Sequence, residues 1–273
     1  MIRPQQYPAG RSDEGLSVRG VSLGYGGGTI VDHVDLDVEP GSFTSIIGPN
    51  GCGKSTLLKG MSRLLTPTTG QVLLDGSPLQ SWKPKAAARR VGLLPQTSNA
   101  PDGSTVYGLV RRGRFPHQGF LAPWNDADER AVTAAMARTG VTELRDAQVG
   151  ELSGGQRQRV WVAMTLAQES GILLLDEPTT FLDIAYQLEL LDLFAELHRE
   201  GRTIVAVLHD LNLAARYSTR IAAMRTGRML AYGTPGDVIT EETMAAVYGV
   251  SCSVIPDPHT GGPLVVPVSR SPQ

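Results

Sequence analysis

The sequence predicts an α/β fold in which a mostly parallel sheet is preceded by an antiparallel β lobe and interrupted by a helical insertion. Three observations lead to this prediction. Short apolar runs alternate with helical patterns, as in parallel sheets whose strands are joined by helices. Near the N-terminus two runs instead alternate apolar with polar residues, which indicates strands with one wet face. Residues 97–150 show no strand pattern, and with the long helix that follows they define a helical insertion over about 97–170.

Composition limits the function classes. The chain has 273 residues, with 25 Lys and Arg against 27 Asp and Glu. This near-neutral balance argues against a nucleic-acid partner, which usually needs a strongly basic domain. Two cysteines, Cys52 and Cys252, are too few for a disulfide framework and fit a reducing compartment. No signal sequence or run of about 18 apolar residues is visible, so we expect a cytoplasmic protein that reaches a membrane only through a partner.

The first elements form the expected antiparallel lobe. We expect residues 1–14 to be a flexible tail and residues 15–250 to form the main domain. Alternation of apolar and polar residues predicts strands over 16–25 and 30–38, joined by a glycine turn. Tyr25 precedes this turn, and it is either an ordinary strand aromatic or a ring on which a nucleotide base stacks. Its position alone does not choose between the two.

A glycine-rich loop follows the apolar strand 43–47 and precedes a helical pattern. It matches the phosphate-binding motif G-x-x-x-x-G-K-[ST], in which the backbone N–H groups and the positive end of the helix point toward phosphate oxygens. The predicted loop residues are Gly48, Pro49, Asn50, Gly51, Cys52, Gly53, Lys54, Ser55 and Thr56. Lys54 would reach the β- and γ-phosphates, and the Ser55 hydroxyl would bind Mg²⁺. Because strand, loop and helix occur together, a chance glycine turn is disfavoured and a P-loop NTPase core is predicted.

Cys52 lies within this loop, near a helix N-terminus. That position tends to lower the pKa of a thiol. The residue is either a redox switch or a small side chain that fits the loop, and we favour the second interpretation.

The remaining elements follow in order. Ser153 and Gln156 have the spacing of a capping box, which predicts a helix that runs to about Glu169. The other expected elements are helices over 84–90, 184–200 and 240–248, and strands over 71–76, 91–94, 172–175, 203–208, 221–224 and 228–232. Residues 251–273 form a short C-terminal extension with a turn between two extended runs.

Several apolar strands end in a residue that can do chemistry. Gln96, the pair Asp176-Glu177 and His209 each follow such a strand. In a parallel sheet these strand ends share one edge, so the side chains should converge near the phosphate loop. Asp176 is predicted to hold Mg²⁺ through water, and Glu177 to deprotonate the attacking water. The alternative, a solvated acidic cap, is less favoured beside a phosphate loop.

The segment Leu152-Ser-Gly-Gly-Gln156, between the phosphate loop and Ile172-Leu-Leu-Leu-Asp-Glu-Pro178, resembles the ATP-binding-cassette (ABC) ATPases over roughly residues 16–250. This resemblance implies two subunits that sandwich two ATP molecules, each with Mg²⁺. It implies that Tyr25 stacks on the adenine, that Gln96 links the Mg²⁺ site to the helical insertion, and that His209 positions the γ-phosphate. It also implies that Asp183 lies at the contact between subunits. The residues that would complete the partner's site are Ser153, Gly154, Gly155 and Gln156.

A closer resemblance is to the ATPases of iron–siderophore importers. It rests on Gly113-Arg-Phe-Pro-His117, Trp124, Gln156-Arg-Gln-Arg-Val-Trp161, Pro178-Thr-Thr-Phe-Leu-Asp-Ile184, Leu208-His-Asp-Leu-Asn212 and the tail around Asp257. Phe181 stands where this subfamily often has tyrosine. The resemblance implies a peripheral protein on the cytoplasmic face of the inner membrane, docked through its helical insertion on multi-spanning permease subunits and served indirectly by a substrate-binding protein. Importers of haem and cobalamin share these motifs, so both remain alternative systems.

The helical insertion bears on partner binding and on the class of cassette ATPase. Arg111, Arg112 and Arg114 form a charge run that is either a solvated face or a contact with phosphate or a partner. We favour contact, because the resemblance implies that the insertion docks on the membrane subunit. The insertion lacks the long heptad segment of cassette ATPases that act on DNA ends, and one phosphate loop disfavours the two-cassette ribosomal class. A non-transport iron–sulfur assembly ATPase remains the alternative from another class, and an exporter is disfavoured because it would usually carry fused membrane segments.

Overall fold

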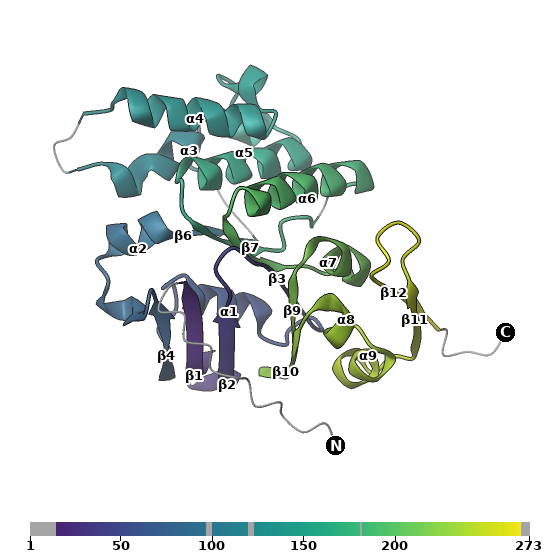
Figure 1. The fold of residues 1–273 in the computed structure, drawn as a ribbon. Coiled ribbons are helices and arrows are strands. Elements are labelled where there is room, and N and C mark those ends of the chain that lie inside the picture. The colour runs from purple at the N-terminus through teal and green to yellow at the C-terminus, as the bar shows by residue number, and fades with distance from the viewer. Residues whose placement is uncertain (1–14, 97–99, 120–122, 181, 269–273) are drawn as a thin grey trace. The chain divides into compact units, whose positions relative to one another are not determined.

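The computed structural model describes residues 15–96, 100–119, 123–180 and 182–268. The expected tail over residues 1–14 and Phe181 therefore lie outside the described residues. The chain divides into two compact units, one formed by residues 1–81 with 203–273 and one by residues 82–202 (Figure 1). The boundaries expected from the sequence stay a prediction, and each unit is described below by itself.

The first unit begins with the antiparallel lobe. Its strands are β1 (Leu16–Tyr25), β2 (Gly28–Val38), β4 (Thr69–Leu74) and β5 (Ser77–Pro78), in the order β2-β1-β4-β5, followed by the 3-10 turn η1 (Leu79–Ser81). Val18 pairs with Leu36, and both side chains are buried. The alternation of apolar and polar residues therefore predicts this lobe correctly, because one face of the sheet is packed and the other is wet.

The same unit contains a set of parallel strands. Strand β3 (Phe43–Ile47) lies between β8 (Thr203–Val207) and β9 (Arg220–Arg225) and is parallel to both, while β10 (Arg228–Gly233) pairs antiparallel with β9. All residues of β3 and β8 are buried, as expected for continuous apolar runs covered on both faces. The helices of this unit are α1 (Lys54–Met61), α7 (Leu211–Tyr217), α8 (Pro235–Val238) and α9 (Glu241–Tyr248).

A hairpin closes the described chain. Strands β11 (Cys252–Pro256) and β12 (Pro263–Pro267) pair antiparallel, as the two extended runs predict. The buried Asp257 organises the turn between them, because its carboxylate accepts the His259 backbone N–H at 2.8 Å and its own N–H donates to the Gly262 carbonyl at 2.7 Å. The Asp257 carboxylate also accepts a hydrogen bond from Arg216 of α7 at 2.9 Å.

This carboxylate makes stability depend on pH. The Arg216 guanidinium, helped by the His259 N–H, lowers the pKa of Asp257 from 3.8 to about 2. Because the pKa is lower in the folded state, the stabilisation is complete above about pH 4 and is lost as the pH falls through about 2. We expect the difference in unfolding midpoint between the wild type and Asp257→Asn to be constant above about pH 5 and to shrink toward pH 2. A difference that stays constant down to pH 2 would contradict this prediction.

The second unit combines two parallel strands with helices. Strands β6 (Val91–Leu94) and β7 (Ile172–Asp176) pair side by side, and α2 (Pro84–Arg90) and α6 (Ile184–Arg199) flank them in the chain. Between the two strands lie α3 (Val106–Val110), η2 (Arg111–His117), α4 (Asp126–Arg138), η3 (Thr142–Leu144), η4 (Val149–Glu151) and α5 (Gly154–Ala167). In the described part of residues 100–170 the elements are helical, apart from one isolated β-bridge between Thr105 and Gln148, so the prediction of a helical insertion is confirmed.

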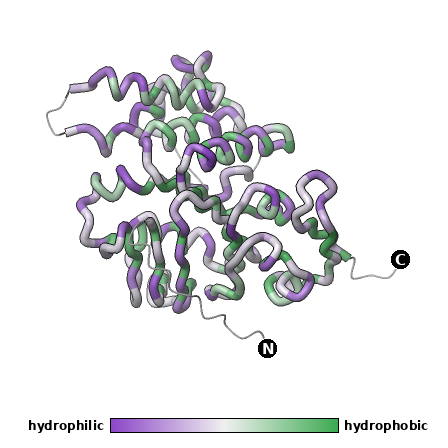
Figure 2. Tube along the Cα trace, in the orientation of Figure 1, coloured by the Kyte–Doolittle hydropathy of each residue, from purple (hydrophilic) through white to green (hydrophobic). Residues whose placement is uncertain are grey.

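The helices of this unit pack through their apolar stripes. The hydropathy colour alternates along α4, as expected for a helix with one buried face (Figure 2). On α4 the buried residues include Val132 and Met136, four positions apart, and on α5 they include Val160 and Ala163. No helix in the described ranges is long and apolar enough to cross a membrane.

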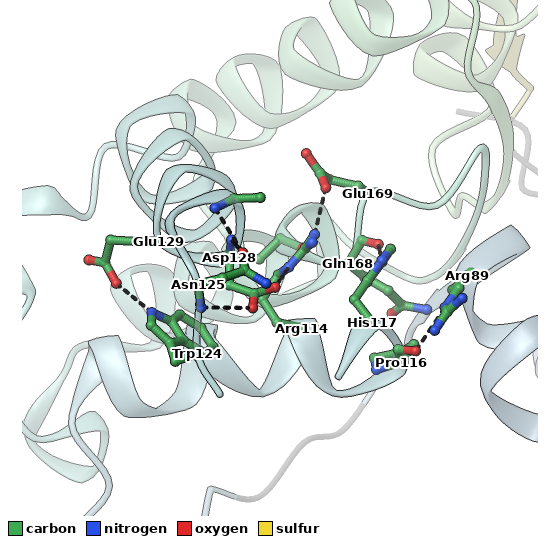
Figure 3. A network of polar contacts seen from close by, with 12 residues as sticks. Arg89, Arg114, Pro116, His117, Trp124, Asn125, Asp128, Glu129, Gln168 and Glu169 are labelled. Atoms are coloured by element: carbon green, nitrogen blue, oxygen red, sulfur yellow. Dashed lines mark hydrogen bonds and ion pairs between the residues drawn. The ribbon is translucent and has the colours of Figure 1, made fainter. Parts of the chain in front are cut away.

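Arg114 corrects one expectation. It does not belong to an exposed charge run, since its residue exposure is 4 %. Its guanidinium donates to Asp128 at 2.9 Å, to the Ala167 carbonyl at 2.9 Å and to Glu169 at 2.6 Å (Figure 3). The side chain therefore joins η2 to the start of α4 and the end of α5, and it is not available as a surface contact.

Candidate functional site

The phosphate loop has the predicted context in the first unit. Strand β3 ends at Ile47, and α1 begins at Lys54 directly after the loop. Gly51 and Gly53 have φ angles of +76° and +106°, a region in which a side chain would be strained. Gly53 is also the N-cap residue of α1. The loop therefore ends at a helix N-terminus, where backbone N–H groups and the helix dipole favour an anion.

Lys54 is held inside the loop. Its residue exposure is 5 %, and its ammonium group donates to the Gly48 carbonyl at 2.7 Å and the Pro49 carbonyl at 2.9 Å. A buried ammonium needs such partners, because burial without them would be costly. The loop thus carries its own positive charge at the position where the motif predicts phosphate binding.

Residues more than 160 positions further along the chain contact the loop backbone: Met224, Gly227 and Tyr248. A Cβ atom on Gly48 would lie 2.2 Å from the Met224 carbonyl oxygen, so only glycine allows this close approach. The Gly227 N–H donates to the Cys52 carbonyl at 3.0 Å. The Tyr248 hydroxyl of α9 makes a hydrogen bond with the Gly48 backbone. Burial raises the pKa of Tyr248, and this outweighs the lowering of the pKa by that hydrogen bond. Sequence reasoning missed these supports, because no local pattern links them to the loop.

Cys52 differs from its expectation. Burial raises the pKa of its thiol, and this outweighs the opposing effect of the nearby Lys54 charge. The expected lowering of the pKa is therefore wrong, because burial dominates the effect of the helix N-terminus here. The buried thiol agrees with the interpretation of Cys52 as a small residue that fits the loop.

The Tyr248 contact predicts an effect on nucleotide affinity. We expect Tyr248→Phe to weaken ATP binding about fivefold, since one lost hydrogen bond costs about 1 kcal/mol. Tyr232→Phe is the matched control, because the half-buried Tyr232 hydroxyl donates a hydrogen bond to the Asp37 carbonyl of β2 at 2.7 Å. The dissociation constant for ATP should rise in the first variant only. Equal affinities in both variants would show that Tyr248 does not hold the loop.

Two other predicted residues lie in this unit. The Tyr25 ring is 50 % exposed at the end of β1, and the Lys59 ammonium lies 5.9 Å from its centroid. A ring exposed in this way is suited to stacking, and its role stays a prediction. His209 follows the end of β8, is exposed and directly precedes Asp210, the N-cap of α7.

Gln96 and Glu177 come together in the second unit. The Gln96 amide donates to a Glu177 carboxylate oxygen at 2.6 Å, although the two residues are 81 positions apart. Thr180 donates to the same oxygen at 3.2 Å, and Glu177 has a left-handed φ of +53°. Asp176, the last residue of β7, is 4 % exposed. Gln96 and Glu177 therefore meet at the ends of β6 and β7, while convergence near the phosphate loop and the chemical roles of these residues stay predictions.

The helix N-terminus at Ser153 has the predicted capping box. Ser153 accepts the Gln156 N–H at 3.2 Å, and the Gln156 side chain accepts the Ser153 N–H at 3.0 Å. Ser153 and Gly154 are exposed. Gln158 of the same helix donates to the Pro178 carbonyl at 3.0 Å, which ties α5 to the segment directly after Glu177.

Asp183 caps α6. Its exposed carboxylate accepts the Tyr186 N–H at 3.0 Å. This cap is sufficient to explain an aspartate at the position, and the predicted subunit contact stays a prediction.

Comparison with known proteins decides the family. The model of the ABC transporter family matches residues 31–180, more than half of the chain. The chain belongs to the ABC transporter family. This range contains both the phosphate loop and the Gln96–Glu177 pair, so the features described above are parts of an ABC cassette.

Relatives of this cassette come from several import systems. The ferric enterobactin transport ATP-binding protein of Escherichia coli is 52% identical, covering 92% of this chain and 93% of the relative. The petrobactin import ATP-binding protein of Bacillus anthracis is 49% identical, with the same coverage of 92% and 93%. The hemin import ATP-binding protein of Myxococcus xanthus is 43% identical, covering 94% and 98%.

A solved structure supports the fold of the cassette. A dimeric ATP-binding cassette in a post-hydrolysis state, bound to ADP and phosphate, is similar with a TM-score of 0.73 at 27% identity. The similarity covers 81% of this chain and 98% of that chain. The predicted α/β fold with an antiparallel lobe and a helical insertion is thus confirmed.

Proposed function

We propose that this chain binds and hydrolyses ATP to power a membrane importer of iron–siderophore complexes. The observation that carries the proposal is a phosphate loop of correct sequence and structure, in a chain 52% identical to a ferric enterobactin transport ATP-binding protein. ATP binding follows from the family. The cargo, Mg²⁺, the membrane partner and the roles of single residues are the parts that need tests.

The nucleotide phosphates are bound by the loop and Lys54. Loop N–H groups and the α1 N-terminus face the α- and β-phosphates, and the Lys54 ammonium leaves the two loop carbonyls for phosphate oxygens. The residues that would hold Mg²⁺ are Ser55 through its hydroxyl, the buried Asp176 through its carboxylate and Gln96 through its amide oxygen. This all-oxygen set fits a hard divalent cation. When bound, the ion neutralises charge that develops on the transferred phosphoryl group.

Glu177 is the general base. Its carboxylate oxygen accepts a proton from a water molecule, and that water attacks the γ-phosphorus to release ADP and inorganic phosphate. The Gln96 and Thr180 hydrogen bonds orient this oxygen. Gln96 is also assigned to the Mg²⁺ site. It would therefore contact both the ion that accompanies the nucleotide and the Glu177 carboxylate, and so connect nucleotide binding with the position of the base.

A second copy of the chain completes each site. The N-terminus of α5, with Ser153 and Gly154 exposed and Gly155 half-buried, faces the γ-phosphate held by the partner copy. Gln156 fixes the conformation of this helix end through the capping box. Tyr25 stacks on the adenine, His209 positions the γ-phosphate, and Asp183 lies at the contact between copies. Dimer closure on ATP and opening after hydrolysis is the movement that the importer uses.

The cargo assignment rests on the order of similarity. The two siderophore relatives are 52% and 49% identical, and the hemin relative is 43% identical. Multi-spanning permease subunits anchor the chain peripherally at the cytoplasmic face of the inner membrane, and a substrate-binding protein delivers the cargo to them. The alternatives are haem or cobalamin import by the same machinery, and a cassette ATPase without a membrane partner.

Growth of a deletion strain tests the cargo. We expect the strain to lose growth on a ferric siderophore as sole iron source and to keep normal use of haem and cobalamin. Loss of growth on haem or cobalamin alone would overturn the cargo assignment.

Affinity purification of the tagged chain from detergent-solubilised membranes tests the membrane partner and should yield a multi-spanning protein. Absence of such a protein would favour a non-transport ATPase.

A further inference from the structure

The C-terminal hairpin contacts one helix at two points on the same helix face. Asn212 and Arg216 of α7 are four positions apart, so both side chains point to one side of the helix. The Val265 N–H of β12 donates to Asn212 at 2.8 Å, and the Asn212 amide donates back to the Val265 carbonyl at 3.3 Å. Arg216 forms its salt bridge with Asp257 at 2.9 Å (the hairpin lies beside α7 in Figure 1).

These contacts matter because β12 of the hairpin is a main packing partner of α7, beside β3 and α8. The helix has seven residues, and Ala214 is its one fully buried residue. Helices of this length are marginal on their own, and their position depends on tertiary contacts. Because the Asn212 side chain binds both the N–H and the C=O of Val265, it fixes the distance between α7 and β12 and their relative position along the strand. The hairpin is therefore a major determinant of how α7 lies.

The hairpin itself is well anchored. Asp257 and Val265 are buried, and the Asp257 turn is closed by its hydrogen bonds to His259 and Gly262. Glu241 of α9 accepts the Val254 N–H of β11 at 3.2 Å, and Val268 donates to the Ser251 carbonyl at 3.0 Å. The hairpin thus behaves as a fixed support for α7.

The supported helix begins two residues after His209. Asp210 caps α7 by accepting the N–H groups of Asn212 and Leu213 at 2.8 and 2.9 Å, so Asp210 is fixed to the first turn of the helix. His209 is joined to this cap residue by one peptide unit, so we expect a tilt of α7 to move His209.

We propose that the β11–β12 hairpin is a positioning element for His209, acting through Asn212 and Arg216 of α7. The inference rests on the proposed role of His209 at the γ-phosphate. It gives the C-terminal extension a function in hydrolysis rather than in nucleotide binding, because α7 carries none of the residues assigned to the phosphates.

The test is a double-mutant cycle on the full chain. Asn212→Ala/Arg216→Ala should lower kcat about tenfold and leave the dissociation constant for ATP within about twofold, since small displacements of a catalytic group reduce turnover. In a His209→Ala background the same two changes should cost nothing further, because the residue they position is absent. Arg216→Lys keeps the cation and should retain most of the activity.

Arg220→Ala is the matched control. It removes a salt bridge of the same length, 2.9 Å to Glu39, with 30 % exposure of the arginine side chain against 36 % for Arg216. Arg220 pairs with Thr44, at the opposite end of β9 from the phosphate loop. Its kcat should be that of the wild type, and the unfolding midpoint of each variant checks that the chain is folded.

Three outcomes would overturn the inference. Normal kcat in Asn212→Ala/Arg216→Ala, with slow hydrolysis in His209→Ala, rejects the hairpin role and leaves the role of His209 intact. Losses that multiply in the triple variant show that the hairpin acts independently of His209. Normal hydrolysis in His209→Ala rejects the proposed role of His209 and the inference together.

Discussion

Glu177→Gln is expected to bind ATP normally and to hydrolyse it about 10²- to 10⁴-fold more slowly than the wild type. The amide has the same shape as the carboxylate and can still accept the hydrogen bond from Gln96, so the local structure should be kept. It cannot take a proton from water, so the base is lost. Phosphate release in a single turnover measures the rate, and size-exclusion chromatography with ATP should reveal a stable dimer.

Glu143→Gln is the control for this experiment. Glu143 is an exposed residue of η3 in the same unit as Glu177, so it tests the loss of one negative charge. Its turnover should equal that of the wild type. Near-normal turnover in Glu177→Gln would remove Glu177 from the mechanism, and another base would have to be found.

Lys54→Ala is expected to lose nucleotide binding as well as hydrolysis. The variant removes the buried ammonium that sits inside the loop, and a hydrogen bond with a charged group contributes about 1.5–3 kcal/mol. This corresponds to about a 10- to 100-fold weaker affinity for ATP. Titration with a fluorescent ATP analogue measures the change directly.

The control for Lys54 is Arg19→Ala. Arg19 is a cation of the same unit that pairs with Asp37 on the β1–β2 face, so its removal changes net charge by the same amount. Affinity should not change in this variant. Unchanged affinity in Lys54→Ala, with the chain folded, would contradict the assignment of the phosphate loop.

Features with a strong local signal were predictable from the sequence. The strand, loop and helix around Lys54 follow from a motif whose glycines must adopt left-handed angles. The capping box at Ser153 follows from two polar residues at the right spacing, and it forms as predicted. The helix that starts there ends at Ala167 rather than near Glu169, because the last turn of a helix frays.

Features that depend on distant packing were not predictable. A charge run does not reveal which of its arginines is buried, and Arg114 is buried because Asp128 and Glu169 both reach it. The pKa of Cys52 depends on burial, which the motif does not contain. The support of the phosphate loop by Tyr248 joins segments that no periodic pattern connects.

The position of β3 in its sheet has a consequence for biosynthesis. Its neighbours β8 and β9 are encoded far downstream, and even the contact just before β3, from Gly41 to Thr203, spans 162 residues. At about 5–20 residues per second the ribosome needs roughly 10–30 s to make that stretch. During this time β3 lacks the two strands with which it pairs in the folded chain, and exposed strand edges of this kind favour aggregation. ATP binding is therefore a property of the finished chain, and a ribosome-released fragment ending before β8 should not bind it.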